Sequence, residues 1–221
     1  MKRLAVLLGT LLGASAHAAV TVETGLGQTS YQLQSDGIWY QLGSPHHTDT
    51  KGKAYMLGLT GDVWANAAGG MAWHADYVDL GRADAWCICT SDANYDYVAH
   101  HVRQTGIVDG TFVGTGRSRG VQMLVEPFVN VGTFRIGLSV GVYYNQPLWD
   151  ETVYGWQGDA ARAPLQVHTP RQWHANRALG LSLSNGRTSL IYMHYTTPVD
   201  PVFPALFKGA DSVMIVWQFK P

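Results

Sequence analysis

The sequence predicts an all-β fold, an eight-stranded antiparallel up-and-down transmembrane β-barrel with short periplasmic turns and long extracellular loops. Three observations lead to this prediction. Apolar side chains alternate with small or polar ones over segments of about ten residues, the pattern of half-buried strands. Tight turns that contain Asn and Gly alternate with long connections. Trp and Tyr gather near the ends of the alternating segments, as in the aromatic girdles of membrane proteins.

Residues 1–18 have the three parts of a secretory signal peptide. Lys2 and Arg3 form a basic start, a short apolar run follows, and small residues in Ala-x-Ala spacing end at Ala18. The apolar run is about half as long as the roughly 20 residues that a spanning helix needs. We therefore expect cleavage after Ala18, which leaves residues 19–221 as one outer-membrane β-barrel domain.

Charge and hydropathy exclude two classes of protein. The formal net charge is −1, and it becomes −3 when Lys2 and Arg3 leave with the signal peptide. The chain shows no basic face, so a nucleic-acid partner is not expected. No later apolar run is long enough for a membrane helix, which excludes a helical membrane protein. The expected location is the bacterial outer membrane, and a soluble periplasmic carrier of a lipophilic ligand is the weaker alternative.

The clearest predicted strand runs from Thr133 to Asn145. One face of this segment is apolar, and the other carries tiny residues and Arg135, as suits a narrow barrel interior that must be filled without clashes. The other seven predicted strands lie near residues 20–26, 55–64, 71–77, 120–130, 179–183, 188–196 and 211–219.

The connections between these strands fall into two groups. Tight turns are predicted at 66–69, 130–132 and 185–187, where Asn and Gly supply the positive φ that hairpins require. Long connections are predicted near 29–52, 81–118, 146–173 and 197–210. Short turns at one rim and long loops at the other are typical of an outer-membrane barrel.

Five ionisable side chains are predicted to point into the barrel from neighbouring strands: Asp62, His74, Asp76, Glu126 and Arg135. Charges in a narrow interior are expected to pair, because an isolated buried ion is costly. We therefore expect a polar network that plugs the lumen and fixes the strand register, with a small polar passage as the alternative. Eight strands enclose too little room for an open water channel.

A second cluster follows the third predicted strand. Cys87 and Cys89, with His100 and His101, could supply the four ligands of a tetrahedral zinc ion. Their spacing matches no familiar zinc module, and in an oxidising compartment a disulfide is the alternative. We therefore expect no metal and no cofactor.

A third cluster lies near the C-terminus, where His194-Tyr195-Thr196 ends one strand and Asp211 begins the last. This part resembles the outer-membrane lipid A deacylase family, whose eight-stranded barrels carry a His-x-Ser pair on the same strand and a Glu at the start of the last one. The resemblance covers roughly the last fifty residues. It implies His194 as base, Thr196 as nucleophile and Asp211 as orienting acid, on the lipid-facing wall. Thr196 stands where the family has Ser, Thr197 where it has Asn, and Asp211 where it has Glu.

Two functional hypotheses follow. The first is a non-catalytic outer-membrane barrel whose extracellular loops bind a surface partner, with outer-membrane lipids and lipopolysaccharide as its surroundings. The second is a lipid A acyl-ester hydrolase. A histidine that continues the apolar outward row of Leu190 and Tyr192 favours a functional role. Alternatively, His194 lies at the outer interface and hydrogen-bonds Thr196 or lipid headgroups.

Overall fold

The computed structural model describes residues 20–33, 45–92, 95–97, 102–104, 107–155, 161, 163–168, 172–196 and 207–219. The predicted signal peptide lies outside these residues and remains a prediction. The strands are β1 (Thr21–Leu33), β2 (His46–Asp49), β3 (Lys51–Ala65), β4 (Gly69–Asp92), β5 (Tyr95–Tyr97), β6 (Val102–Gln104), β7 (Ile107–Val131), β8 (Phe134–Tyr154), β9 (Leu165–His168), β10 (His174–Asn185), β11 (Thr188–Thr196) and β12 (Phe207–Phe219).

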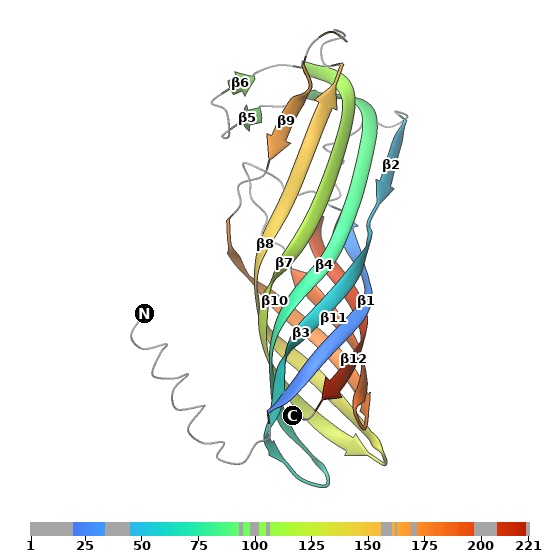
Figure 1. Cartoon of the computed structure of the whole chain (residues 1–221), viewed down its shortest axis with the longest axis vertical. Coiled ribbons are helices and arrows are strands. Elements are labelled where there is room, and N and C mark those ends of the chain that lie inside the picture. Colours follow the sequence, from blue (N-terminus) through green and yellow to red (C-terminus); the bar gives the residue numbers. More distant parts are fainter. Residues whose placement is uncertain are drawn as a thin grey trace, which may run out of the picture.

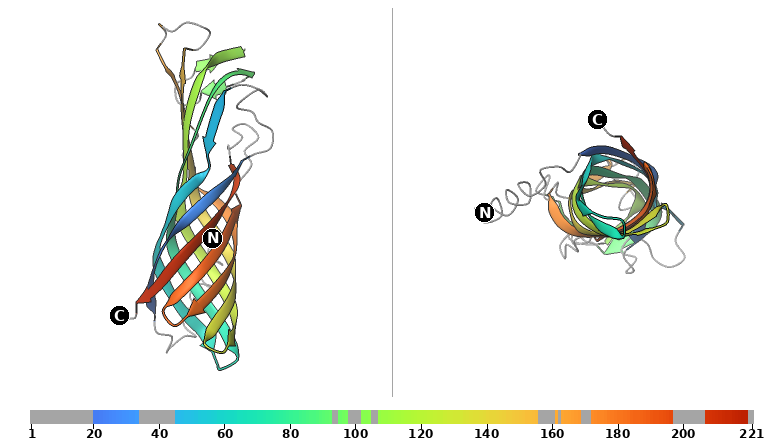
Figure 2. Two further views of the ribbon diagram at one scale, coloured as in Figure 1. Left: turned by 90° about the vertical axis from the view of Figure 1, so that its right-hand side faces the viewer. Right: turned by 90° about the horizontal axis from the view of Figure 1, so that it is seen from below.

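Eight of these strands form a closed barrel. They pair antiparallel in the order β10-β11-β12-β1-β3-β4-β7-β8, and β8 pairs with β10 to close the ring. The strands are tilted against the long axis, and the view along that axis shows the ring (Figures 1 and 2). The predicted eight-stranded antiparallel barrel is therefore confirmed.

Three tight hairpins, β3–β4, β7–β8 and β10–β11, lie at one end of the barrel, here called the hairpin end (Figure 1). In the first, the Asn66 side-chain oxygen accepts the backbone N–H groups of Ala68 and Gly69, at 2.8 and 3.1 Å. Gly132 and Gly186 each adopt φ +61° in the other two turns, a conformation that favours glycine. The opposite end is called the loop end.

Three strands continue far beyond the loop end. β4, β7 and β8 have 24, 25 and 21 residues, whereas β11 has 9. Their upper parts pair with the short strands β2 and β9, and together they form a sheet that stands above the barrel, the protruding sheet (Figure 1). Much of the predicted connections 81–118 and 146–173 is therefore strand, and that part of the prediction is wrong. The register of β3 and β4 also shifts near Val63, which turns Trp64 outward instead of inward.

The outer wall of the barrel is apolar on every strand. Exposed side chains include Leu57 and Leu181, which are 59% and 57% exposed. We call this belt the apolar girdle, and it comprises Leu26, Leu57, Leu59, Tyr77, Val121, Met123, Val125, Leu138, Val140, Val142, Leu179, Leu181, Leu183, Leu190, Val213 and Ile215. Among the described residues, no helix has the length and apolar character needed to cross a membrane.

The barrel interior has two halves. Near the loop end it is filled by apolar and tyrosine side chains, including Met193, Met214 and the ring pair Tyr143–Tyr195, whose centroids are 4.7 Å apart. Toward the hairpin end it is filled by charged and polar side chains. The sequence predicted the polar half, but not that the other half of the lumen is apolar.

Candidate functional site

His194 and Asp211 form a hydrogen-bonded pair on the outer wall. They are direct partners in the register of β11 and β12, and His194 Nδ1 lies 2.8 Å from Asp211 Oδ1. Among the described residues, His194 has no second hydrogen-bond partner, so its Nε2 is free. With the Nδ1 proton directed at the carboxylate, Nε2 is the basic nitrogen of the ring.

Two further side chains hold the Asp211 carboxylate. The Tyr192 hydroxyl donates to Oδ1 at 2.7 Å, and the Gln32 amide donates to Oδ2 at 2.6 Å. These donors come from β11 and β1, the two strands that flank β12. The carboxylate is therefore fixed in place from both sides before any ligand arrives.

The pair is accessible from outside the barrel. The His194 and Asp211 side chains are 34% and 27% exposed. His194 continues the outward row of Leu190 and Tyr192, while Met193 and Tyr195 are buried in the lumen. A molecule that lies against the outer wall can thus reach the free Nε2.

Thr196 lies on the same face, two residues further along β11. Its hydroxyl accepts the backbone N–H of Arg177 at 3.1 Å and lies 3.5 Å from the Arg177 carbonyl oxygen. Within the described residues no hydrogen bond joins Thr196 to His194. The structure brings together two members of the predicted triad, while the hydroxyl of the third contacts the Arg177 backbone instead.

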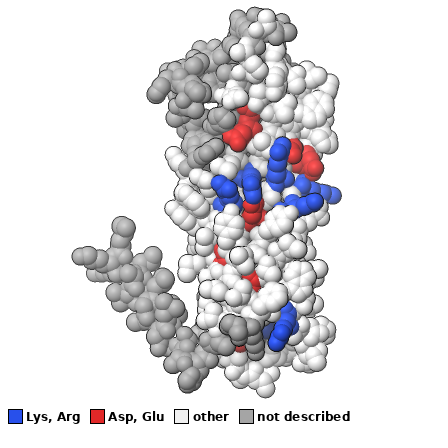
Figure 3. All heavy atoms as spheres, in the orientation of Figure 1, with Lys and Arg blue, Asp and Glu red and all other residues white. Residues whose placement is uncertain are grey.

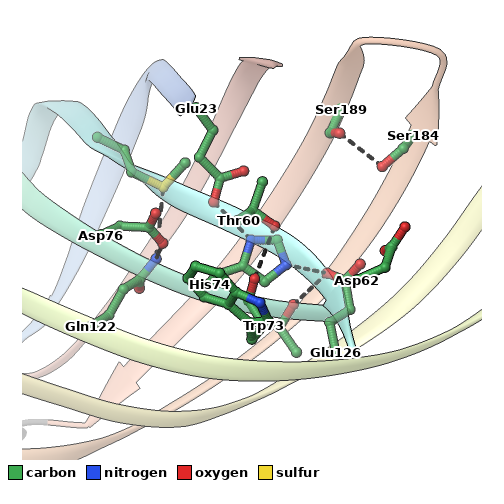
Figure 4. Close-up of polar contacts among 12 residues, drawn as sticks. Glu23, Thr60, Asp62, Trp73, His74, Asp76, Gln122, Glu126, Ser184 and Ser189 are labelled. Atoms are coloured by element: carbon green, nitrogen blue, oxygen red, sulfur yellow. Dashed lines mark hydrogen bonds and ion pairs between the residues drawn. The ribbon is translucent and has the colours of Figure 1, made fainter. Parts of the chain in front are cut away.

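Four of the five predicted lumen residues, Asp62, His74, Asp76 and Glu126, lie close together toward the hairpin end (Figure 4), and Arg135 lies near two of them. Arg135 Nη1 is 3.0 Å from Asp62 Oδ1, and Arg135 Nε is 3.8 Å from Glu126 Oε1. His74 Nε2 lies 3.7 Å from the other oxygen of Glu126. Ion pairs thus link β3, β4, β7 and β8 across the lumen.

Sequence analysis missed three members of this network. Glu23 is fully buried, and its Oε1 lies 2.7 Å from His74 Nδ1. Gln122 donates to Asp76 at 2.8 Å, and Ser139 donates to Glu126 at 2.8 Å. The signal for Glu23 and Gln122 was present, because each stands between outward-facing residues of an alternating strand.

The space left inside the network is small. The cavity beside His74, Asp76 and Glu126 has a volume of about 10 Å³, which is the space of about one water molecule. Donor atoms of Glu23, His74 and Asp76 lie within 4.8 Å of one another, a spacing that also suits a cation. In the structure, His74 Nδ1 and Glu23 Oε1 are hydrogen-bonded to each other.

The predicted cysteine and histidine cluster is only partly described. Cys87 is disulfide-bonded, so its sulfur is not a thiolate ligand. The side chain of Cys89, the other cysteine of the chain, and all of His100 and His101 lie outside the described residues.

A pocket lies on the protruding sheet, within the segments that the sequence assigned to loops. Its volume is about 570 Å³, and its lining includes His47, Arg82, Asp84, Trp86, Asp150 and Gln166. The register explains this grouping. Trp86 on β4 pairs with His47 on β2, while Asp84 pairs with Thr115 on β7, which in turn pairs with Asp150 on β8.

Glu151 also lines this pocket, from the buried face of the sheet. It is 3% exposed, and the Trp149 indole N–H donates to its Oε2 at 3.2 Å. Burial raises the pKa of this carboxyl to about 8, and the Trp149 hydrogen bond opposes the rise. Glu151 is therefore mostly neutral at pH 7.

Comparison with solved structures finds the attachment invasion locus protein, Ail, of Yersinia pestis. Its crystal structure is 9% identical with a TM-score of 0.43, over 90% of this chain and 97% of Ail. Its complex with the heparin analogue sucrose octasulfate is 8% identical with a TM-score of 0.40, over 92% and 99%. Its backbone structure in a phospholipid bilayer nanodisc is 12% identical with a TM-score of 0.33, over 90% and 99%.

No family profile and no curated protein sequence matches the chain. The resemblance to the lipid A deacylase family therefore stays a prediction. The identities to Ail are too low to assign a shared function.

Proposed function

We propose that this protein is an outer-membrane barrel that binds a ligand at the cell surface. In this proposal the apolar girdle spans the outer membrane, the hairpin end faces the periplasm and the protruding sheet stands outside the cell. Two observations support this placement. The ring leaves no barrel strand with an unpaired edge, which a bilayer demands. Exposed apolar side chains follow the outer wall of every barrel strand, and water would not favour them there.

Cell fractionation tests the placement. The protein is expected with the outer membrane, and its gel mobility is expected to change on heating, because closed barrels resist detergent when cold. Recovery in the soluble periplasmic fraction would instead favour the lipophilic carrier.

The pocket on the protruding sheet is the observation that supports binding. It combines the face of Trp86 with the carboxylates of Asp84 and Asp150 and the amide of Gln166. An aromatic face packs against the C–H surface of a sugar ring, and carboxylates and amides hydrogen-bond its hydroxyl groups. We propose a carbohydrate as the ligand.

Binding can be tested with nanodisc-embedded protein on a glycan array. Trp86→Ala is expected to lower retention of the bound glycans at least about tenfold, as expected for an aromatic hot spot. Ile88→Ala is the matched control, because Ile88 is also an exposed outward residue of β4 but does not line the pocket. Absence of any retained glycan, or equal retention by both variants, would refute a carbohydrate site there.

A second function is favoured by the His194–Asp211 hydrogen bond and the free Nε2 of His194. We propose that the pair activates Thr196 for hydrolysis of an acyl ester of lipid A. Nε2 takes the hydroxyl proton as Thr196 Oγ1 attacks the ester carbonyl carbon, and the alkoxide leaves with that proton. Water then hydrolyses the acyl-enzyme, and Asp211 stabilises the transient imidazolium.

Released fatty acid can be followed by mass spectrometry after incubation with lipid A in detergent. His194→Ala is expected to abolish release, and His174→Ala, which removes a histidine at the start of β10, is expected to leave it intact. If the wild type releases no fatty acid, the protein is a binding protein alone.

A further inference from the structure

A group of basic side chains borders the apolar girdle on its loop-end side. It consists of Lys51 and Lys53 on β3, Arg82 on β4, and Arg117 and Arg119 on β7. Arg119 is half-buried and the other four are exposed. In Figure 3 basic side chains form a band across the middle of the face that β3, β4 and β7 present, with the girdle below it. We call this group the cation patch.

The patch brings like charges close together. Arg82 and Arg117 are direct partners in the β4–β7 register. The Lys53 backbone lies beside Gly81, the neighbour of Arg82. Like charges placed directly opposite each other destabilise a sheet. This close placement of basic residues therefore requires anionic groups nearby.

The carboxylates of the chain neutralise only part of this charge. Arg82 pairs with Asp84 at 2.7 Å, and Arg117 pairs with the buried Asp79. The Lys51, Lys53 and Arg119 side chains have no carboxylate partner among the described residues. Within the described residues, these three cations are therefore available to an anionic ligand.

The position of the patch indicates what that ligand is. On β3 the outward residue next to Lys53 is Tyr55, and on β7 the outward residue next to Arg119 is Val121. Both neighbours are large, exposed apolar side chains. A lipid whose acyl chains lie against the girdle would hold its headgroup at the level of the patch, where a phosphate meets the three unpaired cations.

We propose that the cation patch binds the phosphate groups of lipid A in the outer leaflet. This inference rests on the outer-membrane placement proposed above. Of the patch residues, only Arg82 also lines the proposed carbohydrate pocket, and the variants below leave Arg82 unchanged.

Gln28 and Ser30 on β1 stand directly opposite Lys53 and Lys51 in the β1–β3 register, so the patch ends at the border between these two strands. On β10, Arg177 is a single exposed cation beside Leu179, whereas the patch gathers five basic side chains on three neighbouring strands.

Native mass spectrometry of the detergent-purified barrel can test the proposal. The probes are lipid A with two phosphates and the same lipid with both phosphates removed. The triple variant K51Q/K53Q/R119Q removes the unpaired cations and leaves Asp79 and Asp84 paired. We expect it to bind the phosphorylated lipid at least about tenfold more weakly than the wild type.

The matched control is Arg187→Gln, which removes an exposed cation at the hairpin end. This variant is expected to bind like the wild type, and the dephosphorylated lipid is expected to bind all three proteins equally weakly. Heat-modifiable gel mobility verifies that each variant is folded, and the fractionation described above tests the membrane placement separately.

Three results would overturn the proposal. The first is that the triple variant retains as much phosphorylated lipid A as Arg187→Gln does. The second is that removal of the phosphates from lipid A leaves its binding to the wild type unchanged. The third is that inorganic phosphate at millimolar concentration displaces the lipid completely, which would make the patch a site for free anions.

Discussion

Nδ1 of His194 lies 2.8 Å from Oδ1 of Asp211, and the two residues are direct partners across β11 and β12. The contact therefore depends on the register of two neighbouring barrel strands rather than on a loop. A slip of one residue would turn one of the two side chains toward the lumen. The pairing of the barrel strands thus positions the basic Nε2 on the outer wall.

Thr196→Ser is expected to raise the rate of fatty-acid release from lipid A. The Thr196 hydroxyl contacts the backbone of Arg177 and must rotate to meet His194. Serine lacks the methyl group that restricts χ1, so rotation is easier. We expect an increase of about threefold or more, measured by mass spectrometry, while Thr196→Val abolishes release. Equal rates for Ser, Thr and Val would mean that this hydroxyl is not the nucleophile.

His74→Leu is expected to lower the free energy of unfolding by about 3 kcal/mol, because it leaves a buried carboxylate without its partner. His74 contacts Glu23 at 2.7 Å, and both residues are buried. Chemical unfolding in detergent micelles measures the loss.

Adding Glu23→Gln to His74→Leu is expected to recover part of that stability, since the uncompensated charge is then removed. If the double variant is as unstable as the sum of the two single variants, the two side chains are not energetically coupled.

Glu151→Gln is expected to remove a pH dependence of the stability of the protruding sheet. In the folded protein the pKa of Glu151 is about 8, above its ordinary value of 4.5. The stabilisation that neutral Glu151 contributes is complete below about pH 4.5, because the carboxyl is then neutral in both the folded and the unfolded protein. Stability falls as the pH rises toward 8, by at most about 1.4 kcal/mol per pH unit, because the unfolded chain has lost the proton that the folded chain retains.

Unfolding at pH 5, 6.5 and 8 provides the measurement. The Gln variant is expected to gain stability over the wild type as the pH rises. Asp84→Asn, which neutralises an exposed carboxylate of the same sheet, is expected to keep the wild-type slope. Parallel slopes for wild type and Glu151→Gln would show that Glu151 ionises normally.

Gly58→Ala is expected to destabilise the barrel by about 1–3 kcal/mol. A Cβ at this position would lie 2.0 Å from Asp76 Oδ1 and 2.5 Å from the Ala75 carbonyl oxygen. The second atom is backbone and cannot move without disturbing the β3–β4 pairing.

Gly25→Ala serves as the comparison, because its nearest contact would be a Val216 methyl group at 3.0 Å. A smaller loss is expected there, measured by the same unfolding experiment. If both alanines are tolerated equally, close approach of the strands does not explain glycine at position 58.

Periodicity predicted the barrel because lipid and lumen make opposite demands on successive residues. In β8, Ile136 and Leu138 face outward while Gly137 and Ser139 face inward, and the sequence shows this directly. The protruding sheet was missed because its side chains do not continue the alternation of the barrel strands. At Gly81, φ is +78° and the β4–β7 register shifts, so the alternation changes phase where the predicted loop begins.

For the candidate sites, the sequence could predict only whether a side chain faces the lumen or the outer wall. Alternation placed His194 and Asp211 on the outer wall, but the hydrogen bonds from Tyr192 and Gln32 depend on strand neighbours that no local pattern reveals. The surface pocket joins residues of β2, β4, β8 and β9, which meet only through long-range pairing.

The unbroken course of β4, β7 and β8 has a mechanical consequence. A ligand held at the protruding sheet would pull along strands that continue into the barrel, with one register shift near Gly81 in β4. The load would act in shear on many interstrand bonds at once, rather than peeling them apart one by one. A tether to another surface would therefore be as strong as the wall of the barrel itself.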